Sequence, residues 1–454
     1  MFSYRKRISI LLFLLVINTH TSVEDVESFK SIDTIFDLKI AMDNIYNSDL
    51  LSENCIEVDM LVDYVLGCSS KSAYDLDMVS TLKKNHLNIL FVVGHFPSLS
   101  QIFILNMITG LIDKGHNVTI FSFHKDHYTF VHPNIKKYQL LDKIIYKNFP
   151  SQLADYDIVF CQFGYLGNKI LDLPQMKQWL KQGKLAVCFR GSDTTKYVKN
   201  DPHVYRKLFE KGHLFLPVCD YFKKRLIKLG CKPTKIMVHH SGIDCTQFFF
   251  RVRKTPEDGI IHLITTCRLV KKKGVEYAIK AIARVVKNYS NICFTIIGDG
   301  PERAHLKTLI KQLDLQDKVS LQGWVPHEKV VSFLNKAHIF LLPSIRSSDG
   351  NEEGIPNALK EAMAMGLISI ATWHAGNPEL IDHEISGFLV PEKNVAVLAH
   401  TIEYVIEHPE QWSSIGLAAR KKVEEQFETK SLSIELEEML LGLLDRDNGK
   451  MSSL

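Results

Sequence analysis

The sequence lacks the charge bias and the acidic clusters that mark several protein classes. Its formal net charge is +4 over 454 residues, which is too small to indicate a nucleic-acid partner. Two aspartate pairs, Asp75 with Asp77 and Asp155 with Asp157, match the D-x-D pattern of some metal sites. Any two aspartates can form this pattern, and no acidic cluster accompanies either pair, so we predict no metal site.

Paired cysteines are also missing. The nine cysteines are scattered, odd in number and never in C-x-x-C spacing. A disulfide framework usually needs an even number, and a structural zinc site usually brings cysteines in close pairs. The pattern therefore favours free thiols in a reducing compartment.

The N-terminus has no apolar run long enough for a comfortable membrane span. Residues 8–17 are apolar except for Ser9, follow a basic tripeptide at 5–7 and precede polar residues, which is the layout of a secretory signal. An uncleaved peripheral anchor is one alternative. A reading frame that begins too far upstream is another, because Met78 lies just ahead of the first convincing strand. The sequence leaves all three open.

The composition is that of an ordinary globular protein, with 46% hydrophobic and 23% charged residues. A chain of this length can form two or three domains. We expect an N-terminal extension at 1–85, a first α/β domain at 86–250, a second at 251–430, and a C-terminal helix and tail at 431–454.

Strand and helix signals alternate from Leu87 onward. Residues 87–93 are apolar except for Asn88, which is typical of a strand buried on both faces. A turn, a helix at 101–114 and a strand at 118–123 follow, and further strands are expected at 157–160, 185–189 and 214–218. This rhythm predicts a parallel, doubly wound sheet.

A polar connector at 251–259 interrupts the rhythm, which then starts afresh. The expected strands are at 260–265, 292–297, 319–321, 339–342 and 367–371, with helices at 275–287 and 327–335 among them. Two separate parallel sheets predict a cleft, with ligands bound at the carboxyl ends of the strands.

The most informative stretch is 353–366, EGIPNALKEAMAMG. Pro356 suits the first position of a helix, and Gly366 suits the position just past its end. Glu353 lies on the entering loop and Glu361 on the helix, so we expect both carboxylates near the helix N-terminus. Free N–H groups at that end suit a phosphate, and the acids suit sugar hydroxyls. A packed helix with solvated acids is the alternative.

Two further groups follow strands of the second half. Arg268 and Lys273 flank a turn, where two fixed cations could neutralise a diphosphate, although a lysine-rich turn is more often only solvated. Gly298-Asp299-Gly300 allows a tight turn and a close approach of backbone to ligand, but this signal alone is weak. The signals are stronger together than apart.

These motifs resemble those of the retaining glycosyltransferases of family 4. In the second half they are Arg268-Leu269-x-x-x-Lys273-Gly274, Gly298-Asp299-Gly300-Pro301-Glu302, Glu353 with Glu361, and Gly376-Asn377-Pro378-Glu379. In the first half they are Phe96-Pro97-x-x-Ser100, Cys161-Gln162-Phe163-Gly164, Phe189-Arg190-Gly191-Ser192-Asp193 and Ser241-Gly242-Ile243-Asp244. The latter resemble the branch that makes bacterial exopolysaccharide, such as the colanic-acid enzymes.

The resemblance implies a GT-B fold, in which two Rossmann-like doubly wound domains face each other across a cleft. The first would bind the acceptor and the second the nucleotide-sugar donor. Arg268 and Lys273 would hold the donor diphosphate, and Glu361 the ribose hydroxyls. Glu353, with the amides of Gly354 and Ile355, would hold the transferred sugar.

Asp193 and Arg190 would face the acceptor across the cleft, where many relatives have histidine in place of Arg190. Cys267 stands where glycine is usual, and Gln101 where glutamate is usual. The family mechanism needs no dedicated protein nucleophile, no metal and no cofactor beyond the nucleotide-sugar, which fits the residues present.

The sequence therefore predicts a retaining transferase that moves a hexose to a saccharide or lipid-linked acceptor in polysaccharide biosynthesis. Alternatives are a sugar-nucleotide epimerase or phosphorylase on the same fold, and a degenerate glycan-binding relative. We expect a cytoplasmic location because bacterial nucleotide-sugars are cytosolic. Contact with the inner face of the membrane stays open, since the basic amphipathic segment at 221–229 could sit on anionic lipid, although a solvated face is the simpler interpretation.

Overall fold

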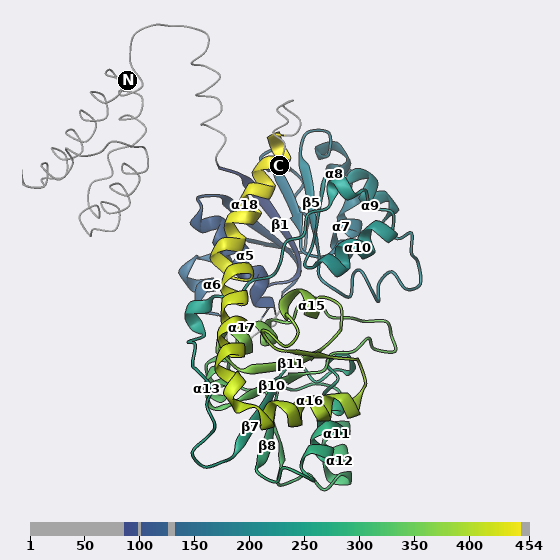
Figure 1. The fold of residues 1–454 in the computed structure, drawn as a ribbon. Coiled ribbons are helices and arrows are strands. Elements are labelled where there is room, and N and C mark those ends of the chain that lie inside the picture. Colours follow the sequence, from purple (N-terminus) through teal and green to yellow (C-terminus); the bar gives the residue numbers. More distant parts are fainter. Residues whose placement is uncertain (1–85, 99–100, 126–131, 446–454) are drawn as a thin grey trace, which may run out of the picture. The chain divides into compact units, whose positions relative to one another are not determined.

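The computed structural model describes residues 86–98, 101–125 and 132–445. The predictions on the N-terminal extension and its apolar run, on the Asp75–Asp77 pair, on Met78 and on Ser100 lie outside these residues. Figure 1 shows two sheets, each enclosed by helices.

The first sheet has six parallel strands in the order β3-β2-β1-β4-β5-β6. Its strands are β1 (Asn88–His95), β2 (Asn117–His124), β3 (Ile144–Tyr146), β4 (Ile158–Cys161), β5 (Lys184–Phe189) and β6 (Leu214–Pro217). Every residue of β4, β5 and β6 is buried. Helices cover both faces of the sheet, which explains why its strands are apolar without alternation.

One face of this sheet packs against α5 (Ile102–Asp113), α6 (Pro133–Lys137) and α18 (Thr429–Asp445). The other packs against α7 (Gly164–Leu171), α8 (Pro174–Trp179), α9 (Arg206–Lys211) and α10 (Asp220–Lys228). The last helix, α18, follows the second sheet in the chain but lies along α5, and its Leu436 and Leu440 join the first core (Figure 1). We call this assembly the first lobe.

The second sheet also has six parallel strands, in the order β12-β11-β10-β7-β8-β9. Its strands are β7 (Ile261–Thr266), β8 (Ile292–Ile297), β9 (Val319–Gly323), β10 (Ile339–Leu342), β11 (Ile368–Thr372) and β12 (Phe388–Val390). With its helices it forms the second lobe.

The helices of the second lobe also lie on both faces of their sheet. The first face packs against α11 (Val275–Val285), α12 (Arg303–Gln312) and α16 (Val395–Glu407), and the other against α13 (His327–Lys336), α14 (Asn357–Ala364) and α17 (Trp412–Gln426). The short α15 (Asn377–Leu380) follows β11. In α11, Ala278, Ile279 and Ile282 are fully buried at helical spacing, which directs this apolar stripe into the core.

Both sheets have the same strand order. The first strand of each, β1 or β7, lies between the second and fourth strands of its sheet. Successive connections therefore leave in opposite directions at this point, and the loops that follow these central strands diverge to form a crevice. The predicted pair of doubly wound parallel sheets is confirmed.

The chain crosses between the lobes at two adjacent places. The amide of Ile243 donates to the carbonyl of Phe427 (2.9 Å), and the amide of Thr429 donates back to Ile243 (3.0 Å). The two crossings are thus joined by a single β-bridge between Ile243 and Glu428.

The predicted strands agree with the structure to within two residues. The three-residue strands β3 and β12 were not predicted, because so short a segment shows no periodicity. Among the helices, the one after Glu353 begins at Asn357 and not at Pro356, whose ψ of 130° is extended. Gly366 adopts a φ of +79° just past the helix, as predicted.

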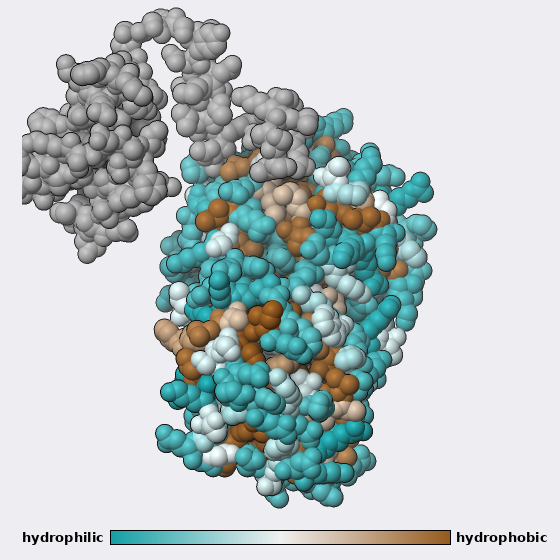
Figure 2. Space-filling model, viewed as in Figure 1, coloured by the Kyte–Doolittle hydropathy of each residue, from teal (hydrophilic) through white to brown (hydrophobic). Residues whose placement is uncertain are grey.

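The face seen in Figure 2 is mostly hydrophilic, with apolar residues in small separate groups. Among residues 86–98, 101–125 and 132–445, no helix combines the length and apolarity that crossing a bilayer requires.

Candidate functional site

A cavity of ≈ 840 Å³ is lined by loops from both lobes. From the first lobe come Gln101, Phe103, Phe163, Arg190, Gly191, Ser192, Val218 and Ser241. From the second come Arg268, the 270–273 turn, Pro301, Glu302 and the 347–357 loop with a gap at 350 and 352. The second-lobe residues include the loops after β7 and β10, the two strands that flank the crevice of the sheet. We call this cavity the central pocket.

The loop after β7 brings several cations to the pocket. Lys271–Lys273 form one turn of 3-10 helix that ends at Gly274, whose φ is +65°. A Cβ at Gly274 would lie 1.8 Å from the carbonyl oxygen of Pro343, so only glycine allows the turn to pack on the end of β10. Arg268 and Lys273, both predicted here, line the pocket together with Lys271 and Lys272.

Gly298 and Gly300 pack closely against the backbone of the same loop. Their φ angles are +132° and +155°, and a Cβ on them would lie 1.9 Å from the Cys267 oxygen and 2.4 Å from the Leu269 oxygen. Neither glycine lines the central pocket. In the structure both glycines approach the backbone that carries Arg268, and the contact predicted between them and a ligand stays a prediction.

Glu353 is buried in the central pocket as an ion pair with two lysines. One carboxylate oxygen lies 2.6 Å from Lys272 Nζ, and the other contacts Lys273 Nζ. Burial alone would raise the pKa of Glu353, but the two lysines outweigh it and lower the pKa to about 2. Glu353 is therefore ionised at neutral pH.

The backbone of Glu353 is held by a histidine that the sequence did not single out. Its N–H donates to Nε2 of His374 (3.0 Å), and Nδ1 of His374 lies 2.6 Å from Glu392. A ring nitrogen that accepts a hydrogen bond carries no proton, so His374 is the neutral tautomer with its proton on Nδ1. Neither residue has a motif that could have revealed this role.

The residues that follow Glu353 also line the central pocket, namely Gly354, Ile355 and Asn357. Asn357 begins α14, and the first N–H groups of a helix have no partner within the helix. The positive end of the α14 dipole therefore lies at the pocket, as predicted.

Glu361 lies elsewhere. It is the fifth residue of α14 and lines a neighbouring cavity of ≈ 590 Å³, where its carboxylate is 3.8 Å from His327 Nε2. This pairing raises the pKa of His327. Asn357 lines both cavities. The two acids therefore do not line the same cavity, because Glu353 lies on the loop before α14 whereas Glu361 lies one turn inside the helix.

Arg190 lines the central pocket, as predicted. Its guanidinium donates to Gln162 Oε1 (2.7 Å) and Ser241 Oγ (3.0 Å), and stacks over the Phe103 ring at 4.3 Å. These contacts hold the guanidinium plane in one orientation at the first-lobe wall of the pocket.

Asp193 does not face the cleft, which corrects its predicted position. It is fully buried, and its carboxylate accepts the N–H groups of Arg190 (3.0 Å), Gly191 (2.8 Å) and Gly164 (3.1 Å). Burial raises the pKa of Asp193, and these backbone N–H groups act against that rise. The carboxylate organises the loop that presents Arg190.

Lys360 was also missed by sequence reasoning. It is fully buried on α14, its Nζ donates to the carbonyl of Ser241, and burial lowers its pKa to about 7. It connects the second lobe to the segment that crosses between the lobes. In the described part of the chain, no three histidine, cysteine or acidic side chains are grouped to hold a metal ion.

Comparison with known proteins places these features in context. Residues 247–422 match the family model for glycosyl transferases group 1. A putative colanic acid biosynthesis glycosyltransferase, WcaL of Salmonella typhimurium, is 32% identical over 408 residues, which are 78% of this chain and 99% of the relative. The amylovoran biosynthesis glycosyltransferase AmsK of Erwinia amylovora is 32% identical over 395 residues, 75% of this chain and 96% of the relative.

Among solved structures, HepE of Anabaena in complex with UDP matches with a TM-score of 0.64. The match covers 78% of this chain and 100% of HepE at 16% sequence identity. At that identity the likeness concerns the fold, a pair of facing doubly wound domains.

Proposed function

Because the chain belongs to the group 1 glycosyltransferases, a family of retaining, metal-independent transferases with the GT-B fold, we propose that it transfers a hexose from a nucleotide diphosphate sugar. The acceptor in this proposal is a saccharide or a lipid-linked saccharide of exopolysaccharide synthesis. The names of the colanic acid and amylovoran relatives support that process, and the UDP bound to HepE supports a uridine nucleotide as the first probe.

The charge of the central pocket carries this proposal. Five cationic side chains line it, namely Arg190, Arg268, Lys271, Lys272 and Lys273. Three carboxylates, those of Glu302, Asp349 and Glu353, also line it. The excess of positive charge suits a diphosphate, whose negative charge grows as the bond to the sugar breaks. Fixed cations in a partly enclosed site stabilise a charge that develops in the transition state.

The positions of the side chains suggest a placement of the donor. Arg268 and Lys273 would bind the diphosphate, with the N-terminus of α14 beside them. Glu353 would accept hydrogen bonds from the transferred sugar, and Gly354 and Ile355 would supply backbone contacts. Glu361 would bind the ribose in the neighbouring cavity, which meets the central pocket at Asn357.

The acceptor would enter from the first-lobe wall. Arg190 offers a fixed guanidinium there, next to Phe103 and Phe163. Asp193 would act indirectly, by fixing the loop of Arg190. We place this chemistry on the cytoplasmic side, where bacterial nucleotide-sugars are made. The same proposal includes contact of the protein with the inner membrane surface through the basic residues of α10.

The test is a panel of UDP- and GDP-sugars, examined first by isothermal titration and then for transfer and hydrolysis. We expect one nucleotide class to bind and its sugar to be released or transferred with retention at the anomeric carbon. An epimerase would return an altered nucleotide-sugar without releasing the nucleotide. A glycan-binding relative would show no affinity for any nucleotide.

A further inference from the structure

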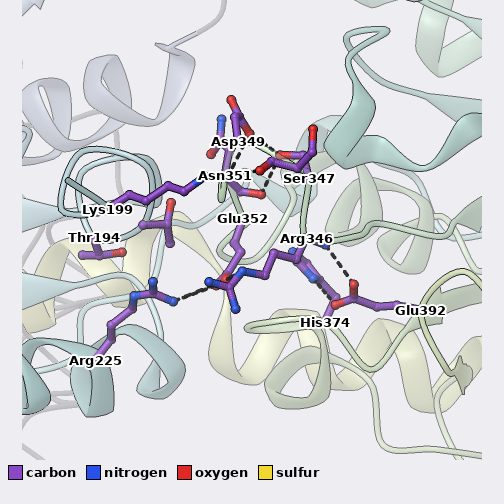
Figure 3. Close-up of polar contacts among 12 residues, drawn as sticks. Thr194, Lys199, Arg225, Arg346, Ser347, Asp349, Asn351, Glu352, His374 and Glu392 are labelled. Atoms are coloured by element: carbon purple, nitrogen blue, oxygen red, sulfur yellow. Dashed lines mark hydrogen bonds and ion pairs between the residues drawn. The ribbon is translucent and has the colours of Figure 1, made fainter.

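Glu352, the residue just before Glu353, joins the two lobes. Its buried carboxylate lies 3.2 Å from Arg225 Nη1 of α10 in the first lobe and 3.0 Å from Arg346 Nε in the second. Figure 3 shows the two arginines reaching Glu352 from different elements. Of these two consecutive glutamates, Glu352 pairs with an arginine from each lobe, whereas Glu353 pairs with two lysines of its own lobe.

The backbones around this ion pair are closely packed. A Cβ on Gly191 would lie 3.2 Å from the backbone carbonyl oxygen of Glu352, and one on Gly354 would lie 2.9 Å from a methyl group of Val218. Next to them, Ile355 packs against the buried cluster that includes Val218 and Phe222. The loop that carries Glu353 is thus in direct contact with the wall of the first lobe.

The beginning of α10 is held from the second lobe as well. The N–H groups of Asp220 and Tyr221 donate to the carboxylate of Glu379, at 2.8 and 3.1 Å. A carboxylate at this end also interacts favourably with the helix dipole. Helix α10 is therefore attached to the second lobe at its first turn by Glu379 and further along by Glu352.

We propose that Glu352 is a positioning residue whose bridge to Arg225 holds α10 against the Glu353 loop and so excludes water from the central pocket during transfer. This inference rests on the proposed function for its chemistry, but the contact itself does not. Unlike the exposed ion pair between Lys196 and Asp349, which also joins the lobes, the Glu352 carboxylate is almost fully buried. Removing an exposed pair costs little, whereas removing one partner of a buried, hydrogen-bonded pair at an interface is costly and speeds separation of the partners.

Water exclusion decides which of two reactions follows donor cleavage. In both, the bond between the anomeric carbon and the diphosphate oxygen breaks. The carbon then bonds either to the acceptor hydroxyl oxygen, which completes transfer, or to a water oxygen, which completes hydrolysis. The proton lost by that hydroxyl or water goes to the leaving diphosphate or to solvent. A looser contact between α10 and the Glu353 loop admits water and favours hydrolysis.

Arg225→Met tests the bridge without leaving a buried charge alone, because Glu352 keeps its contact with Arg346. Lys196→Met is the matched control, since it removes the exposed inter-lobe pair. Hydrogen–deuterium exchange of the full-length protein without ligand measures the contact directly. In Arg225→Met we expect the first turn of α10 to exchange about tenfold faster, with β1 and β7 unchanged, and Arg225→Lys to restore part of the protection.

The second readout is the ratio of hydrolysis to transfer, with UDP-glucose as the first donor tried and then any donor that the panel selects. We expect the hydrolysed share to rise severalfold in Arg225→Met and to stay at the wild-type value in Lys196→Met. A variant that is merely less stable loses both reactions together and keeps the ratio.

Unchanged exchange at α10, equal increases throughout the protein, or an unchanged ratio despite local opening would each overturn the inference. If the wild-type protein turns over no nucleotide-sugar, the proposed function fails instead. The exchange result then still decides whether Arg225 and Glu352 hold the lobes together.

Discussion

Lys273 forms an ion pair with Glu353 inside the central pocket, so that the loop after β7 is fixed to the loop after β10. These two loops follow strands that are neighbours at the crevice of the second sheet. Glu353 thereby holds the lysine charge in place before any substrate arrives. A charge that is already positioned need not reorganise during the reaction, which is the main source of electrostatic catalysis.

Replacing this lysine should remove catalysis and leave the fold intact. In Lys273→Ala we expect turnover of the nucleotide-sugar to fall by about 10²–10³, because the leaving diphosphate loses a positioned cation. Glu353 keeps Lys272 as a partner, so the melting temperature should change little. Steady-state rates with the selected donor measure the effect, and Lys421→Ala, at an exposed position of α17, is the control. Wild-type turnover in Lys273→Ala would refute the assigned site.

Glu361 should affect binding of the nucleotide more than the chemical step. It lines the neighbouring cavity and not the central pocket, so Glu361→Ala removes an acceptor for hydroxyl groups at a distance from the bond that breaks. A hydrogen bond to a charged group contributes ~1.5–3 kcal/mol, so UDP affinity should fall about tenfold or more. Titration with UDP measures it, with Glu384→Ala as an exposed control. An equal loss of turnover at saturating donor would place Glu361 at the reacting centre instead.

Asp193→Asn should destabilise the first lobe. One amide NH₂ group replaces an acceptor oxygen, so at least one of the buried N–H groups of Arg190, Gly191 or Gly164 loses its partner. An unsatisfied buried donor costs about 1–3 kcal/mol. We expect a lower melting temperature and a weaker loss of turnover than in Lys273→Ala. Asp172→Asn, which alters an exposed ion pair of the same lobe, should leave the melting temperature unchanged.

The sequence was sufficient to predict both sheets and the group formed by Arg268, Lys273 and Glu353. Buried parallel strands are apolar along their whole length, and residues that follow neighbouring strands meet at one edge. The local sequence pattern does not determine the direction in which a side chain points. Asp193 turns inward because three backbone N–H groups lie there, and Gly298 and Gly300 pack closely against the neighbouring loop. These outcomes depend on contacts between segments far apart in the chain.

The pairing of Glu352 with Arg225 illustrates the same limit. The two residues are far apart in sequence and lie in different lobes, and neither belongs to a motif. The close packing of Gly191 against the Glu352 carbonyl oxygen and of Gly354 against Val218 brings the two lobes together beside this ion pair. Residues that join lobes are thus the least predictable part of the site from sequence alone.

The buried amine of Lys360 should make stability depend on pH in the neutral to alkaline range. Burial is the main cause that lowers its pKa to about 7, the charge of Arg190 lowers it further, and the charge of Glu361 acts in the opposite direction. In the unfolded chain the pKa returns to its ordinary value of 10.5. Between these values the unfolded chain binds more protons than the folded protein, so stability from this group rises with pH. Below pH 7 the full penalty of burying the charged amine is present.

Lys360→Met removes that titration and keeps most of the side-chain volume. We expect the melting temperature of Lys360→Met, relative to wild type, to be most favourable below pH 7 and to decline steadily toward pH 9.5. The lost hydrogen bond to Ser241 lowers the variant by a similar amount at every pH, because a neutral amine still donates in the wild type. Lys421→Met should track the wild type throughout. A constant difference between Lys360→Met and wild type from pH 6.5 to 9.5 would mean that the amine stays protonated inside the fold and that its pKa is not lowered.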